Sequence, residues 1–120
     1  MSLIPPPPPS EYGNLIGLMA SLYSRRFTLI SFHFPAELSE LEAQHHIQPV
    51  INMADDWLKY AGNCWIVWSA KTPTEWHAQF QTIERLKNCT IFIINLDISP
   101  GNRAGQAPMW VWDWIGKRRI

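Results

Sequence analysis

Four histidines and two cysteines are the residues of this chain best suited to bind a metal ion. His45 and His46 are adjacent, so on a helix their side chains point about 100° apart and do not converge on one ion. His33 and His77 have no partner at the short spacing of a zinc motif, and the two cysteines lie far apart. We therefore predict no metal site.

The carboxylates and the glycine-bearing loop do not complete a catalytic or cofactor motif. Asp55 and Asp56 lie near the end of a predicted helix, where turn formation or solvated charge explains them better than acid–base catalysis. Residues 101–105, Gly-Asn-Arg-Ala-Gly, lack the lysine and hydroxyl of a phosphate-binding loop. We therefore predict no catalytic residue and no cofactor, and a non-enzymatic role is favoured.

Basic residues occur together with tryptophans, a combination typical of surfaces that bind nucleic acid or protein. Cationic side chains neutralise phosphates and tryptophans stack on bases. Two other interpretations remain open, because basic residues at a helix C-terminus match the helix dipole and tryptophans anchor protein interfaces. The candidate interaction residues are His33, Arg25, Arg26, Arg103, Trp110, Trp112, Trp114, Lys117, Arg118 and Arg119.

Length and composition indicate one ordinary globular domain. The chain has 120 residues, and ten basic and ten acidic residues give no net charge, which excludes a generic polyanion binder. No apolar run reaches about 18 residues and no signal-peptide pattern is present, so we expect a cytoplasmic protein without a membrane partner. Cys64 and Cys89 are then expected to be buried free thiols.

The elements that must position these residues are clearest between Cys64 and Asp97. Residues 64–68 are apolar, aromatic and β-branched, as a buried strand requires. Residues 72–75, Thr-Pro-Thr-Glu, form a capping box with proline at the first helical position. A helical pattern of apolar residues extends from there to Lys87, and residues 90–97 form another strand.

The first half of the domain adds a strand, a broken helix and a second strand. Residues 27–34 alternate between two faces as a strand does. Residues 37–56 are mostly helical, but Pro49 lacks the N–H that the preceding turn needs, so we predict two short helices, the second starting at Pro49. Residues 57–60 form a strand that turns back into the strand beginning at Cys64.

The order strand, helix, strand, strand, helix, strand predicts an α+β fold of the ferredoxin-like kind. This fold is a four-stranded antiparallel sheet with two helices on one face. It occupies residues 27–120, whereas residues 1–26 carry a polyproline block and a predicted N-terminal helix. Alternating tryptophans in the tail fit a strand, but Pro108 before them and Gly116 after them favour a Trp-rich C-terminal helix.

From Phe27 onward, the chain resembles the SinR-like and VapD-like small ferredoxin-fold proteins, which are related to the small nuclease-like subunit of the CRISPR adaptation machinery. The resemblance rests on Phe-Thr-Leu-Ile-Ser-Phe at 27–32, Cys-Trp-Ile-Val at 64–67 and Trp-Asp-Trp-Ile at 112–115. It implies a dimer. In nuclease-type relatives an aspartate closing the first strand holds a divalent metal across that dimer. His33 takes that position here, and imidazole is a poor ligand for magnesium.

We therefore expect a small, non-catalytic, homodimeric interaction protein that binds an unidentified protein partner. The resemblance implies a bacterial or phage setting, such as phage defence or a toxin–antitoxin pair. The first alternative is a nucleic-acid-binding protein that uses Arg25, Arg26, Arg103 and the basic tail. The second alternative is a divalent-metal-dependent nuclease of the CRISPR-adaptation-subunit type.

Overall fold

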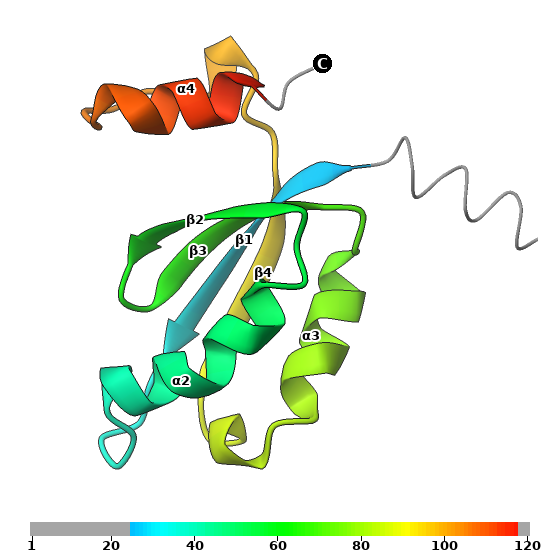
Figure 1. The fold of residues 1–120 in the computed structure, drawn as a ribbon, viewed down its shortest axis with the longest axis vertical. Helices are drawn as coiled ribbons and strands as arrows, with labels where there is room; N and C mark the ends of the chain where they lie inside the picture. Colours follow the sequence, from blue (N-terminus) through cyan, green and yellow to red (C-terminus); the bar gives the residue numbers. More distant parts are fainter. Residues whose placement is uncertain (1–24, 118–120) are drawn as a thin grey trace, which may run out of the picture.

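The computed structural model describes residues 25–117 of the chain (Figure 1). The polyproline block and the helix predicted after it lie outside these residues, as do Arg118 and Arg119. The described elements, in chain order, are β1 (Arg26–His33), α2 (Glu40–Ile51), β2 (Asp56–Ala61), β3 (Cys64–Ser69), α3 (Pro73–Gln81), the 3₁₀ turn η1 (Glu84–Leu86), β4 (Thr90–Leu96), the 3₁₀ turn η2 (Pro100–Asn102) and α4 (Met109–Lys117).

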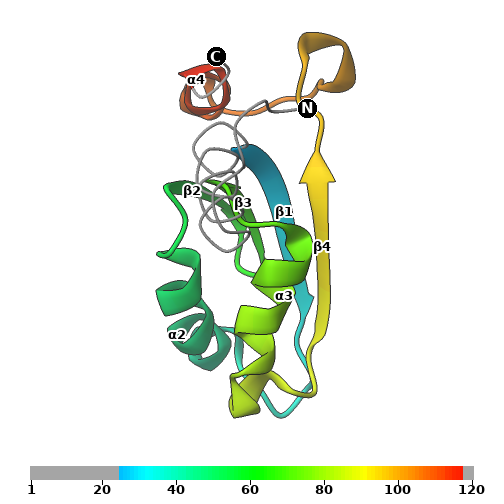
Figure 2. The same ribbon diagram turned by 90° about the vertical axis from the view of Figure 1, so that its right-hand side faces the viewer.

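The four strands form one antiparallel sheet in the order β2-β3-β1-β4, so β2 and β4 are its edges. β1 pairs with β3 on one side and with β4 on the other, where the ladder runs from Phe27 opposite Leu96 to His33 opposite Thr90. Helices α2 and α3 both cover the same side of the sheet, as Figure 1 and Figure 2 show from two directions. We call the opposite side the outer face. The prediction of an α+β fold with a four-stranded antiparallel sheet is confirmed.

Alternation along the strands decides which side chains reach the helices. Ile30 of β1 lies opposite Trp65 of β3 and Ile93 of β4, and all three contribute to the core under α2 and α3. Their neighbours in sequence therefore point to the outer face, because successive strand residues alternate. The core contains Ile30, Phe32, Leu38, Ala43, Ile47, Ile51, Trp65, Val67, Trp76, Phe80 and Leu86.

The helix start predicted at Thr72 is confirmed in detail. The Glu75 N–H donates to Thr72 Oγ1 at 3.2 Å, and the Thr72 N–H donates to Glu75 Oε1 at 3.0 Å, with Pro73 at the first position of α3. This reciprocal bonding satisfies two of the N–H groups that a helix N-terminus leaves unpaired. The C-terminal tryptophans form the helix α4, as Pro108 and Gly116 favoured.

The prediction that Pro49 divides residues 37–56 into two helices was wrong. α2 is a single helix that begins after Ser39 and contains Pro49 in its last turn. A proline removes the hydrogen bond to the carbonyl four residues earlier, which belongs to His45. Both residues are exposed, so water can bind the carbonyl that the proline leaves unpaired. Exposure at the end of the helix makes the proline tolerable.

The helix predicted to extend to Lys87 ends earlier. α3 stops at Gln81, and the separate turn η1 follows. The Thr82 hydroxyl donates to the carbonyl of Gln79 at 2.7 Å, and such a local side-chain bond competes with continuation of the helix. Leu86 of η1 is still buried in the core, so the apolar spacing was informative although the backbone is not one helix.

Candidate interaction surface

His33 lies at the exposed end of β1, opposite Thr90 of β4. The His33 side chain lies on the outer face, because successive strand residues alternate and the preceding residue, Phe32, is in the core. Among residues 25–117, no group of three or more histidine, cysteine or acidic side chains is arranged to hold a metal ion. Because its side chain is exposed, His33 is accessible for contact with a partner.

The two arginines that precede the first predicted strand bind other parts of the domain. Arg25 Nε donates to Asp55 Oδ2 at 2.6 Å, in an ion pair that is about one-third to one-half exposed. Arg26 Nη1 donates to the backbone carbonyl of Ala70 at 3.0 Å. These contacts fasten the start of β1 to the residue just before β2 and to the residue just after β3, so these two side chains are occupied within the domain.

Arg103 lies in the loop between β4 and α4 and stacks on a tryptophan. The centre of its guanidinium lies 6.0 Å from the centroid of the Trp112 ring, a cation–π distance. Its Nη1 atom is buried and has no hydrogen-bond partner. The contact ties the loop to α4.

The three tail tryptophans face different surroundings. The Trp114 ring contacts Phe27 of β1 edge-on, with 5.7 Å between ring centroids. Trp112 is half-buried under Arg103, whereas Trp110 is mostly exposed. Lys117 is exposed at the end of α4. The predicted residues are thus distributed over several places.

Neither free thiol is activated as a nucleophile. Cys64 and Cys89 are half-buried and unpaired with each other. Burial raises the pKa of the Cys64 thiol, with an opposing hydrogen bond from Ser31, and burial also raises the pKa of Cys89. Since the thiolate is the reactive form, both groups are less reactive than an exposed cysteine.

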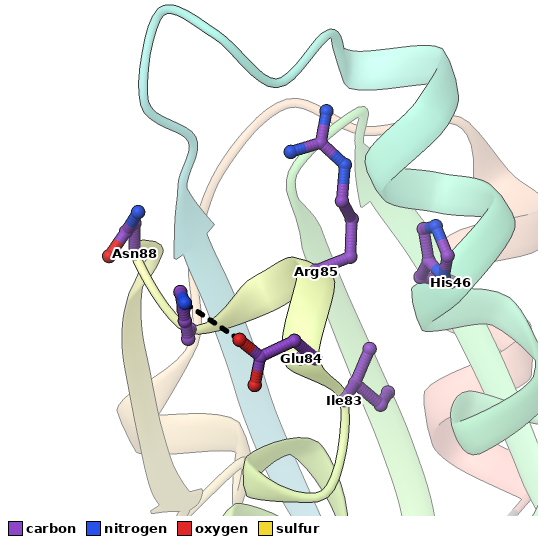
Figure 3. Close-up of a pocket in the computed structure, with 6 residues that line it drawn as sticks. His46, Ile83, Glu84, Arg85 and Asn88 are labelled. Carbon is purple, nitrogen blue, oxygen red and sulfur yellow. Dashed lines mark hydrogen bonds and ion pairs between the residues drawn. The ribbon is translucent and has the colours of Figure 1, made fainter.

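A hollow of about 500 Å³ lies between α2 and η1 and is lined by His46, Ile83, Glu84, Arg85, Lys87 and Asn88. Figure 3 shows Glu84 and Arg85 on η1 opposite His46 on α2. Arg85 forms two hydrogen bonds with the carboxylate of Glu42, and Lys87 Nζ lies 2.6 Å from Glu84 Oε1. These charges are paired with each other within the protein, so none of them is left for a ligand. The hollow is a solvated groove between η1 and α2.

Lowering the pH is expected to remove the stabilisation that Glu42 gains from Arg85. The hydrogen bond from Arg85 holds the pKa of Glu42 below its ordinary value, so folding favours the ionised carboxylate. This contribution is fully present at neutral pH and is lost as the pH falls through the folded-state pKa. Urea unfolding of the wild type and of Glu42→Gln, from roughly pH 7 to pH 3, measures it.

The stability difference between these two proteins should shrink toward zero at acid pH. Leu41→Gln serves as the control, since Leu41 is exposed beside Glu42 on α2 and has no ionisable group. Its difference from the wild type should not show this decline. A Glu42→Gln difference that is independent of pH would contradict the assignment.

The sequence interpretation did not identify β4 as an exposed surface. Phe92 and Ile94 point to the outer face, and their side chains are 55% and 38% exposed. Two hollows of about 340 and 300 Å³ lie on the other side of the strand, toward α3, and Ile91 and His77 line both. We call Phe92, Ile94 and the free edge of Thr90–Leu96 the β4 surface. A signal was present, because residues 91–94 are apolar at every position, whereas α3 covers only one face of β4.

Among the helices that the structure describes, none is both long and apolar enough to cross a bilayer. A scan of protein-family models, a search of curated proteins and a search of solved structures each returned no match. The resemblance to SinR-like and VapD-like proteins therefore stays a prediction.

Proposed function

We propose that this protein is a small non-catalytic interaction protein that forms a homodimer through its β4 surface. The observation that carries the proposal is the exposure of Phe92 and Ile94 next to each other on one face of an edge strand. Exposed apolar groups that cluster on a sheet are typical of protein interfaces, whereas scattered ones are not. His33, opposite Thr90, adds a polar residue at the rim of this surface.

We also infer that the domain has ferredoxin-like topology. Read from the β4 edge, the strand order is β4-β1-β3-β2, with antiparallel neighbours and both crossover helices on one side. This arrangement supports the inference because two split βαβ units interlock in that order. It also leaves the outer face beside β4, where Phe92 and Ile94 are exposed, open to a partner.

A protein partner is favoured over nucleic acid by the state of the basic residues. Arg25 is paired with Asp55, Arg26 with a backbone carbonyl, and Arg103 is stacked on a tryptophan. Phosphate binding would require each of these contacts to be exchanged for a new one. β4 itself carries no lysine or arginine. A nucleic acid lying on its exposed surface would therefore find no cationic side chain of this strand beside its phosphates.

The non-catalytic part of the proposal is supported by the chemistry of the candidate groups. Within residues 25–117, His33 belongs to no group of histidine, cysteine or acidic side chains that could hold a metal ion. Burial raises the pKa of both cysteine thiols. A setting in phage defence or a toxin–antitoxin pair remains a prediction of the resemblance alone.

Light scattering coupled to size-exclusion chromatography tests the proposal with the full-length chain. We expect the wild type to have twice the 13.9 kDa mass of one chain, and Ile94→Lys to have the mass of a monomer. A lysine at this position places a charge in the apolar contact, while its partial exposure spares the fold.

Leu41→Lys is the matched control, because Leu41 is 81% exposed but lies on α2, away from β4. It should remain dimeric. A monomeric wild type, or equal effects of the two lysines, would overturn the proposal. The same samples, titrated with single-stranded RNA and DNA at low salt, would reveal the nucleic-acid alternative as binding that declines with added salt.

A further inference from the structure

The two edges of the sheet differ in how well they are protected against pairing with another strand. The β2 edge carries Asp56 and Lys59, and its pairing with β3 shifts register between Lys59 and Ala61. Charged residues and irregular pairing are the usual devices that prevent an edge strand from adding a further strand. β2 is therefore a protected edge.

The β4 edge has none of these devices along Thr90–Leu96. Its sequence, Thr-Ile-Phe-Ile-Ile-Asn-Leu, contains no charged residue and no proline. Its pairing with β1 is regular over seven consecutive positions, without a bulge. Figure 2 shows β4 at the outer border of the described chain, with no other element beyond it. A straight, uncharged edge strand of this length is a template for another strand.

We propose that β4 of one chain pairs antiparallel with β4 of a second copy, so that the dimer contains a continuous eight-stranded sheet. This inference rests on the proposed homodimer and specifies its geometry. A molecule with one open and one protected edge forms a closed pair, since joining two β4 edges leaves only β2 edges outside. Pairing β4 with β2 would instead build an open filament, which the charges and irregular register of β2 disfavour.

The length of β4 determines the register. Directly opposite residues in an antiparallel pair share a face of the sheet, so the two-fold axis must pass through a residue position. An axis at Ile93 pairs all seven residues of the strand, whereas an axis at Phe92 leaves the last two residues of each strand unpaired and an axis at Ile94 leaves the first two unpaired. With the axis at Ile93, Phe92 of each copy lies directly opposite Ile94 of the other copy, so the dimer contains this contact twice.

This register joins the exposed apolar side chains to each other. Phe92 and Ile94 are the two large side chains that β4 exposes on the outer face, and each covers the other across the new ladder. Aromatic and β-branched residues are a favourable cross-strand pair. On the opposite side, the hollow lined by Pro73, Thr74 and His77 lies along Ile91 and Ile93, where the added strand needs space for its own side chains.

Cysteine cross-linking of the full-length chain tests the register. In a background with Cys64→Ser and Cys89→Ser, one preparation carries Phe92→Cys and the other carries Ile94→Cys with a mass tag. After mixing and equilibration, the cross-linked dimer that joins a tagged chain to an untagged chain should form about tenfold faster than a cross-linked dimer forms in either preparation alone. The reason is that directly opposite Cβ atoms are about 5 Å apart, whereas diagonal ones are about 7 Å apart. A short thiol cross-linker is used together with air oxidation, so that the two cysteines can also be joined when they occupy a hydrogen-bonded pair of the antiparallel ladder.

Each outcome separates the register from the dimer itself. Fast cross-linking of Phe92→Cys alone, or of Ile94→Cys alone, would place the axis at that residue and overturn the proposed register. A wild type that is dimeric by light scattering, together with no cross-link in any mixture, would also overturn it while leaving the proposed function intact. A monomeric wild type would refute both.

Discussion

Replacing Trp76 with alanine is expected to lower the free energy of unfolding by about 3–5 kcal/mol, the usual cost of removing a buried large aromatic side chain. Trp76 is 0% exposed and lies on α3 against the sheet. Its ring stacks on Phe80 with 6.4 Å between centroids, and its indole N–H donates to Ser69 Oγ at 3.2 Å. Alanine would leave a cavity and deprive the buried Ser69 hydroxyl of a hydrogen-bond donor.

Urea unfolding followed by circular dichroism at one fixed protein concentration measures this loss. Trp110→Ala is the control, because it removes the same side chain from a position on α4 that is 57% exposed. It should change the free energy of unfolding by no more than about 0.5 kcal/mol. Equal losses from the two substitutions would show that α3 does not hold the core as the structure indicates.

The order of elements could be predicted from the sequence because its signals are local. The capping box at Thr72 involves residues three positions apart, and the alternation of β1 is visible over eight consecutive residues. Such short-range patterns are present in the sequence before any tertiary contact forms. The α+β class follows from that order.

The errors arose where a local rule depends on its surroundings. Pro49 breaks a helix when its missing hydrogen bond is buried, but here the position is exposed in the last turn of α2. The end of α3 depends on the hydroxyl of Thr82 bonding back to Gln79, which the apolar spacing does not report. Both cases concern where a helix ends, and neither changes which residues enter the core.

The candidate surface could be predicted only in part, because contacts distant in sequence decide it. Arg25 pairs with a residue 30 positions away and Arg26 with one 44 positions away, so grouping basic residues by sequence overestimated how many are free. The exposure of Phe92 depends on β4 being an edge strand, and that follows from the strand order in the sheet. His33 was placed correctly on the face opposite Phe32 by alternation alone.

The stability of the protein is expected to depend on its own concentration. If folded chains are paired through β4, unfolding also separates the two copies, and mass action favours the folded dimer as the concentration rises. A hundredfold dilution should then lower the apparent free energy of unfolding by about 2.7 kcal/mol per dimer. The midpoint of thermal unfolding should fall accordingly.

Thermal unfolding of the wild type over a hundredfold concentration range measures this dependence, with Ile94→Lys and Leu41→Lys in parallel. Ile94→Lys should unfold at one temperature regardless of concentration, because a monomer releases no partner. Leu41→Lys should keep the dependence of the wild type, since its charge lies on α2 rather than at the edge strand. A wild-type midpoint that does not change with concentration would mean that β4 has no partner when the chain folds, and that Phe92 and Ile94 face solvent in the working protein.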